Sequence, residues 1–161
     1  MSKTKKKLKI GFDKNPLSAL FHKKIKHEIG TGLHEVDRNY SLIKEFAPQF
    51  HRGLKLHPSI QDYQKTNKYQ ANSYIVIAPA SVWFTKQYPK EKWVEFLTEV
   101  QGFKTLIIGA PSDKELANEI INQSKNSNIE NLCGKLNLLQ SAALMRNAKM
   151  CYVNDSAPQH L

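Results

Sequence analysis

Between residues 73 and 153, four short apolar runs alternate with three segments of helical apolar spacing, and this alternation constrains the fold more than any other feature. The runs are SYIVIA (73–78), KTLIIGA (104–110), NLC (131–133) and KMCYV (149–153). Short continuous apolar runs are typical of strands buried on both faces of a sheet. Their alternation with helices predicts a doubly wound α/β domain, in which helices cover both faces of a parallel sheet.

The three segments between these runs have helical signatures. Ser112 with Glu115, and Asn137 with Gln140, have the spacing of a capping box at the start of the second and third segments. In the first segment, KEKWVEFLTEV, the apolar residues fall on one face of a helix at i, i+3, i+4 and i+7. These residues are Trp93, Phe96, Leu97 and Val100.

The first 72 residues do not follow this alternation. LKIGF (8–12) is expected to form a strand, and RNYSLIKEFA (38–47) has the apolar spacing of a helix. Residues 48–72 contain two prolines and the polar run QKTNKYQAN, so we interpret them as a linker. We expect residues 1–47 to be the remnant of one domain and residues 73–161 to form another.

The positive charge of the chain is concentrated at its N-terminus. Of a formal net charge of +10, residues 1–27 supply +8 through nine lysines and one acidic residue. Such a block suits a solvated tail, the phosphates of a nucleic acid or an anionic membrane surface. No apolar run approaches the ~20 residues that cross a bilayer, and the N-terminus lacks the apolar stretch of a signal peptide, so we expect a cytoplasmic location.

Neither cysteine predicts a metal site or a disulfide framework. Cys133 and Cys151 are far apart and lie in short apolar contexts, which favours buried thiols that pack as small hydrophobic side chains. We therefore expect no bound metal.

Three loops leave the carboxyl ends of the predicted strands: residues 79–89, 109–112 and 154–160. In an open parallel sheet, ligands bind outside these ends, so the loops should converge on one edge. The first loop holds Ser81, Thr85 and Lys86 ahead of a helix, where hydroxyls, an ammonium and free backbone N–H groups suit a phosphate. The alternative is that these residues bind no ligand and the loop simply packs against the rest of the domain. The sequence contains neither the GxGxxG nor the GxxxxGK[ST] motif, which disfavours dinucleotide and P-loop sites.

The last loop, NDSAPQHL, has two interpretations. Asp155 or Ser156 would cap a following helix, with Pro158 in its first turn. Alternatively, the exposed N–H groups of that helix would hold a diphosphate, with His160 one turn inside. Histidines are also candidates for acid–base catalysis, but for His34 a surface or capping role is favoured.

Together, three segments resemble the ADP-heptose–lipopolysaccharide heptosyltransferase family. They are APASVWFTKQYPKEKW, LIIGAPSDKELANEI and NLCGKLNLLQSAALMRNAKMCYVNDSAPQHL. That family shows P-G-[AS]-x-x-x-x-K-[RHQ]-[WY]-P, then N-L-x-G-K, then D-[ST]-G-x-x-H-[LA], and the order and spacing match across about residues 74–161. The resemblance implies half of a GT-B fold: a Rossmann-like C-terminal domain that binds the nucleotide sugar, incomplete here at its C-terminus, and part of the N-terminal acceptor domain.

The resemblance also implies a glycosyltransferase site. Its donor-binding residues would be Ser81, Thr85, Lys86, Asp155, Ser156, Ala157 and His160. Lys86 would be catalytic by stabilising the charge that develops on departing ADP. No residue of the chain corresponds to the family's catalytic base, so this chain alone is expected to bind donor without turning it over. The expected donor, ADP-heptose, is a substrate rather than a cofactor.

The acceptor implied by the resemblance is lipopolysaccharide core, which places the protein at the inner face of the inner membrane. Two alanines depart from the family pattern. Ala80 and Ala157 stand where the family usually has glycine, and a methyl group there disfavours positive φ and close backbone approach to a phosphate. Two other functions stay open: a basic nucleic-acid-binding module that uses the lysine-rich N-terminus, and a noncatalytic α/β scaffold.

Overall fold

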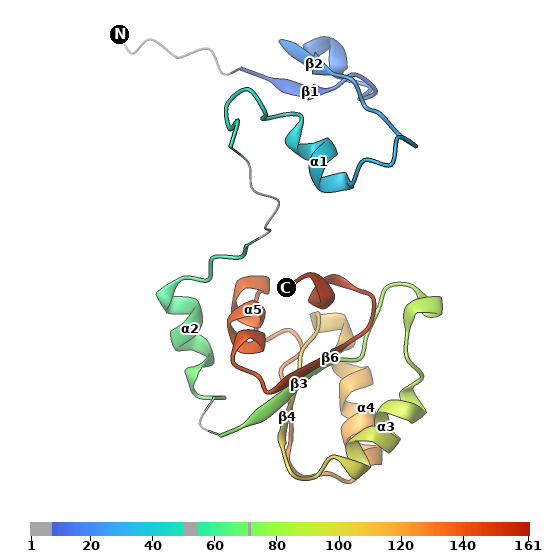
Figure 1. Cartoon of the computed structure of the whole chain (residues 1–161). Helices are drawn as coiled ribbons and strands as arrows, with labels where there is room; N and C mark the ends of the chain where they lie inside the picture. Colours follow the sequence, from blue (N-terminus) through green and yellow to red (C-terminus); the bar gives the residue numbers. More distant parts are fainter. Residues whose placement is uncertain (1–7, 50–54, 71) are drawn as a thin grey trace. The chain divides into compact units, whose positions relative to one another are not determined.

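A computed structural model describes residues 8–49, 55–70 and 72–161, which fall into two units divided after residue 54 (Figure 1). The second unit contains a parallel sheet with strand order β5-β4-β3-β6. Its strands are β3 (Tyr74–Ala78), β4 (Lys104–Ile107), β5 (Ile129–Asn131) and β6 (Met150–Val153). Its helices are α2 (Ile60–Asn67), α3 (Lys90–Glu99), α4 (Lys114–Ser124) and α5 (Leu138–Arg146). The predicted parallel sheet with helices on both faces is confirmed.

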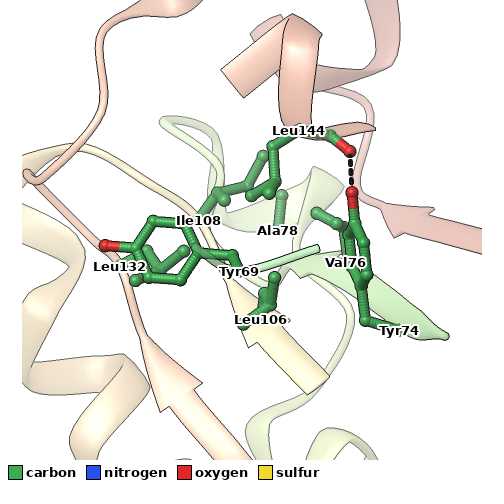
Figure 2. Packing of buried hydrophobic residues seen from close by; sticks show 8 residues of the cluster. All are labelled: Tyr69, Tyr74, Val76, Ala78, Leu106, Ile108, Leu132 and Leu144. Atoms are coloured by element: carbon green, nitrogen blue, oxygen red, sulfur yellow. Dashed lines mark hydrogen bonds between the residues drawn. The ribbon is translucent and has the colours of Figure 1, made fainter. Parts of the chain in front are cut away.

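The central strand β3 is buried along its whole length because helices cover both faces of the sheet. Alternate residues point to opposite sides, so Tyr74, Val76 and Ala78 join one hydrophobic cluster and Ile77 joins the other. The first cluster includes Leu144 of α5, and α2 packs beside α5 (Figures 1 and 2). The second cluster takes its helical members from α3 and α4. Each fully buried aliphatic side chain contributes about 1.5–3 kcal/mol.

One buried polar contact ties α5 to the sheet. The Tyr74 hydroxyl donates a hydrogen bond of 2.6 Å to the carbonyl of Leu144 (Figure 2). That carbonyl is near the C-terminal end of α5, where the last carbonyls of a helix lack partners within it. The contact satisfies the buried Tyr74 hydroxyl, adds to the 3.3 Å bond that this carbonyl accepts from the Asn147 N–H, and attaches the end of α5 to β3.

Helix α2 lies inside the segment that the sequence predicted to be a linker. Ser59 and Asp62 form a capping box at its start, in which the Ser59 backbone N–H donates to the Asp62 carboxylate over 2.8 Å. At its side, the Arg146 guanidinium donates to the Tyr63 hydroxyl over 2.9 Å. Packing against α5 gives this short, mostly polar helix the support that its own sequence does not supply.

The third strand is also displaced from its prediction. It spans Ile129–Asn131, two residues before the predicted run NLC. Because β5 pairs on one side only among the described strands, its residues are half-buried and its sequence is partly polar. Leu132 and Cys133 lie just after the end of β5. Leu132 packs into the cluster that contains Tyr74, and Cys133 packs into the cluster that contains Ile77.

The first unit holds two short parallel strands, β1 (Ile10–Phe12) and β2 (Lys23–Ile25), and helix α1 (Glu35–Tyr40). The strand predicted near residue 10 is confirmed. The helix predicted over residues 38–47 is misplaced, since α1 ends at Tyr40 and turns follow it. Ile43 and Phe46, expected on its buried face, are 48% and 62% exposed.

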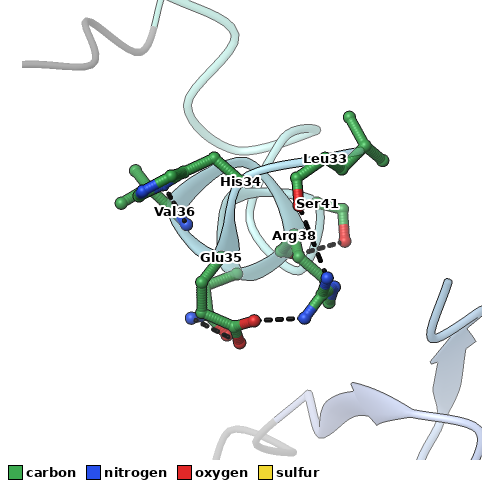
Figure 3. A network of polar contacts seen from close by, with 7 residues as sticks. Leu33, His34, Glu35, Val36, Arg38 and Ser41 are labelled. Atoms are coloured by element: carbon green, nitrogen blue, oxygen red, sulfur yellow. Dashed lines mark hydrogen bonds and ion pairs between the residues drawn. The ribbon is translucent and has the colours of Figure 1, made fainter. Parts of the chain in front are cut away.

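Side chains fix the start of α1. The predicted capping role of His34 is confirmed, because its Nδ1 accepts a hydrogen bond of 3.2 Å from the backbone N–H of Val36 (Figure 3). One turn on, Arg38 forms an ion pair with Glu35 and donates to the Leu33 carbonyl over 3.4 Å (Figure 3). These contacts give His34 a structural role.

Candidate functional site

A pocket of about 670 Å³ opens at the carboxyl ends of β3 and β4. Its volume is typical of small-molecule sites. All three loops that follow the strands contribute to its wall, together with the start of α5. The predicted convergence of these loops on one edge of the sheet is therefore confirmed, and it follows from the parallel pairing of β3 with both β4 and β6.

An ion pair joins the first and third loops. The Lys86 Nζ lies 2.5 Å from the Asp155 Oδ2, and the two side chains are 44% and 55% exposed. Lys86 ends a short 3-10 helix, Phe84–Lys86, whereas Asp155 follows β6. The hydrogen bond and charge of Lys86 hold the pKa of Asp155 below its ordinary value, and His160 lowers it further. A lysine ammonium has three donors, so Lys86 can contact an anion while it keeps this partner.

The structure separates the predicted site residues into two groups. Ser81, Ser156 and Ala157 line the pocket. The others are not lining residues: Thr85, Lys86, Asp155 and His160. Lys86 and Asp155 are nevertheless joined to the lining residues through their loops, and Thr85 and His160 are exposed.

The cap predicted for the last loop does not form. The segment Ala157–His160 is a single 3-10 turn, and the Ser156 side chain makes no capping hydrogen bond to it. Instead, the Ser156 hydroxyl donates to the Asn154 carbonyl over 3.4 Å. The backbone of Ser156 is extended, with φ of −153°, and the residues after it, Ala157, Pro158 and Leu161, line the pocket.

Two glycines bring the second loop close to the segment after β5. The Gly134 N–H donates to the Gly109 carbonyl over 2.9 Å, and both residues line the pocket. Gly134 has φ of +74°, and a Cβ there would lie 3.0 Å from the Cα of Pro111. Glycine is therefore required at this position by backbone conformation and by space.

The capping box predicted for Ser112 and Glu115 is wrong. Helix α4 begins at Lys114 after a 3-10 turn, and Asp113 takes the capping role by accepting the Ala110 N–H over 2.7 Å. Ser112 donates its hydroxyl to the same carboxylate over 3.1 Å. The helix therefore starts one residue later than the predicted box implies, after a 3-10 turn that begins at Pro111.

The start of α5 forms another side of the pocket. The predicted capping box is confirmed: Gln140 N–H donates to Asn137 Oδ1 over 2.9 Å, and Asn137 N–H donates to Gln140 Oε1 over 3.1 Å. Asn137, Leu138 and Ser141 line the pocket. The positive end of this helix dipole thus faces the cavity and favours a negative group there.

Neither alanine in a usual glycine position is strained. Ala80 and Ala157 both line the pocket. Over the ranges that the structure describes, Lys125 is the one non-glycine residue with positive φ. The two methyl groups therefore add bulk to the pocket wall without distorting the backbone.

Sequence reasoning assigned no role to Asn154, although it joins two loops. It is 7% exposed, its Nδ2 donates to the Pro79 carbonyl over 2.7 Å, and its Oδ1 accepts the Tyr88 N–H over 3.2 Å. The available signal was its position: a polar residue directly after a strand, where the chain must still satisfy buried backbone groups.

Two further features of the described residues bear on the site. Within residues 8–49, 55–70 and 72–161, no three His, Cys, Asp or Glu side chains gather in a group that could hold a metal ion. In the same ranges, no helix has both the length and the apolar character that crossing a lipid bilayer requires.

The whole chain, residues 1–161, matches the model of glycosyltransferase family 9 (heptosyltransferase). No curated protein sequence matches it significantly. Among solved structures, a family 9 glycosyl transferase from Veillonella parvula DSM 2008 is similar, with a TM-score of 0.75 at 20% identity over 95% of this chain and 47% of that one.

Two Escherichia coli structures are similar as well. Heptosyltransferase WaaC with ADP gives a TM-score of 0.59 at 20% identity, covering 92% of this chain and 49% of that one. ADP-heptose lps heptosyltransferase II gives 0.57 at 22% identity, covering 76% and 42%. The chain thus spans about half the length of the solved structures that it matches, and the likeness agrees with the predicted GT-B type of fold.

Proposed function

The chain belongs to glycosyltransferase family 9 (heptosyltransferase), and from this premise we propose that it forms the donor-binding part of an enzyme that transfers heptose, or a related sugar, to lipopolysaccharide core. The observation that carries the proposal is the convergence of three loops and the start of α5 on one pocket, with Lys86 fixed at its edge by Asp155. Residues 73–161 would be the nucleotide-sugar-binding domain, and residues 1–47 part of the acceptor domain.

The proposed donor is ADP-heptose, bound as substrate. WaaC, one of the similar structures, was solved with ADP and with ADP-2-deoxy-2-fluoro heptose. In this chain, hydroxyls at Ser81 and Ser156 and the start of α5 would bind the diphosphate. The complete donor site would contain Ser81, Thr85, Lys86, Asp155, Ser156, Ala157 and His160. No metal is needed for this arrangement, because cationic and N–H groups supply the charge.

During transfer, an acceptor hydroxyl oxygen would attack the anomeric carbon of the sugar. The bond from that carbon to the phosphate oxygen breaks, its electron pair stays on ADP, and the hydroxyl proton goes to a general base that is not one of the donor-site residues. Negative charge therefore grows on the diphosphate. The Lys86 ammonium and the N–H groups of α5 would stabilise that charge without reorganising, which lowers the barrier.

Lipopolysaccharide core as the acceptor implies that the enzyme acts at the inner face of the inner membrane. The lysine-rich start of the chain, which would contact anionic lipid there, includes residues 1–7, which lie outside the described residues. Nucleic acid is not the proposed partner. If it were, duplex DNA binding would weaken steeply with salt and would be lost on deletion of residues 1–9. Contact with anionic lipid would respond in the same way, so the two uses are separated by the probe, duplex DNA or vesicles that contain anionic lipid.

Calorimetric titration of the chain with ADP-heptose, ADP and a UDP-sugar tests the proposal. We expect saturable binding of the two adenine ligands, weakened about tenfold by Lys86→Met, which is the loss of one charge-assisted hydrogen bond. Lys92→Met is the matched control, since Lys92 forms an exposed ion pair with Glu95 on α3, with an Nζ–Oε2 distance of 2.6 Å, away from the pocket. Absence of saturable binding of either adenine ligand would refute the proposal.

A further inference from the structure

One side chain, that of Asn154, holds both ends of the loop of residues 79–89. The Asn154 amide donates to the carbonyl of Pro79 over 2.7 Å and accepts the N–H of Tyr88 over 3.2 Å. These two backbone groups lie at opposite ends of the loop, and Asn154 thus bridges its base. To bridge a backbone carbonyl and a backbone N–H, a side chain needs both a donor and an acceptor. The asparagine amide supplies both in one plane.

The rest of the loop is closed on itself. Gln87 donates its side-chain amide to the Ser81 carbonyl over 2.6 Å, and the Lys86 N–H donates to the Trp83 carbonyl over 2.9 Å. Its tip has little packing, because Val82 and Phe84 are 91% and 86% exposed. A loop with few buried apolar contacts takes its position from the contacts at its base. There, the Asn154 bridge is joined by the ring of Tyr88, whose centroid lies 5.3 Å from that of Trp93.

The bridge also aligns the two loops that carry the exposed ion pair. Asn154 directly precedes Asp155, and its own N–H donates to the Ala78 carbonyl at the end of β3 over 3.4 Å. The residue is therefore attached to β3, to the base of the Lys86 loop and, through the chain, to Asp155. Burial strengthens these hydrogen bonds, because water does not compete for the amide.

We propose that Asn154 is a positioning residue, which fixes Lys86 at the edge of the pocket by clamping both ends of the loop that carries it. Its importance for donor binding rests on the proposed function, but the clamp itself does not. Without the amide, the two loops separate at their base and the Lys86–Asp155 contact becomes one of several arrangements.

The test compares Asn154→Ala with Asn126→Ala. Asn126 is an equally buried control at 7% exposure, and it bridges backbone groups in the same way: its Nδ2 donates to the Leu97 carbonyl over 2.8 Å and its Oδ1 accepts the Asn128 N–H over 2.9 Å. It contributes nothing to the pocket wall. Both variants lose a comparable buried amide, so a difference between them reports on position rather than on stability.

Two readouts follow. Carbon NMR titration of the Asp155 carboxyl group should show its pKa rising toward the ordinary value in Asn154→Ala, because Lys86 no longer stays beside it, and remaining low in Asn126→Ala. The dissociation constant for ADP should rise about tenfold in the first variant only. A pKa of Asp155 that is unchanged in Asn154→Ala, or that rises equally in both variants, would overturn the clamp.

A measurement on the unmodified chain keeps the clamp testable if Asn154→Ala does not fold. Amide hydrogen exchange of Tyr88 should be at least about tenfold slower than that of Phe84 in the exposed tip, since only a lasting hydrogen bond protects an amide in so exposed a loop. Equal exchange at the two positions would overturn the clamp. If the Asp155 pKa shifts as expected but the unmodified chain does not bind ADP, the clamp stands and the proposed function fails.

Discussion

Replacement of Gly134 by alanine is the sharpest test of how the pocket wall is built. Gly134 has φ of +74°, and an added Cβ would lie 3.0 Å from the Cα of Pro111, a backbone atom that cannot move alone. The left-handed conformation costs alanine about 1–2 kcal/mol. Displacement of a packed neighbour adds about 1–3 kcal/mol. We therefore expect Gly134→Ala to lower the free energy of unfolding by about 2–5 kcal/mol.

Gly102→Ala provides the matched control, since a Cβ there meets no atom within 4 Å. Its effect should stay within about 0.5 kcal/mol. Asparagine tolerates positive φ, so Gly134→Asn keeps the contact with Pro111 but loses part of the backbone cost. It should fall between the two alanine variants.

Urea unfolding, followed by the fluorescence of the buried Trp93, measures all three variants. Because Gly134 and Pro111 both line the pocket, ADP binding should weaken in Gly134→Ala and not in Gly102→Ala. Equal stability of Gly134→Ala and Gly102→Ala would refute the account of this wall.

Three further outcomes are expected. Tyr74→Phe removes the 2.6 Å hydrogen bond to the Leu144 carbonyl, which keeps its 3.3 Å bond from the Asn147 N–H, and should cost about 0.5–1.5 kcal/mol in urea unfolding; an unchanged stability would mean that the hydroxyl contributes nothing there. Burial raises the pKa of Cys133 to about 11 from 9.0, so between these values the folded state keeps a proton that the unfolded state releases. The contribution of this thiol to the free energy of unfolding should be full below pH 9 and be lost as pH rises from 9 to 11, so that stability falls less steeply in Cys133→Ala. Parallel plots of stability against pH for the two proteins would contradict this. Lys86→Met removes the main cause of the low pKa of Asp155, which should rise toward its ordinary value in an NMR titration; an unchanged pKa would mean that the ion pair does not persist in solution.

The sequence was most informative where burial is complete. Strands β3 and β4 were predicted because both faces of each are covered, which demands continuous apolar runs. The half-buried β5 was misplaced toward Leu132 and Cys133, whose burial comes from the turn after the strand. Helix α2 was missed because its stability depends on packing against α5, a contact between distant segments that no local pattern encodes.

The candidate site also has features that the sequence predicts and features that it does not. Topology alone predicted that the three loops would meet, since parallel strands present their carboxyl ends at one edge. The position of Asn154 directly after a strand is visible in the sequence, but its hydrogen-bond partners are not, because they depend on the register that pairs Ala78 with Val153 and so sets Asn154 beside Pro79. Likewise, the shift of the α4 N-cap from Ser112 to Asp113 depends on a turn whose geometry the residue types allow but do not require.

The central claim is that three separate loops hold a nucleotide at the carboxyl edge of the sheet. Amide NMR shifts recorded during a titration with ADP test it most directly. We expect the largest changes at Ser81, Gly109 and Ser156, with little change at Ser73 and Phe103, which flank the opposite ends of β3 and β4. Changes concentrated at Ser73 and Phe103, or in residues 8–49, would contradict it.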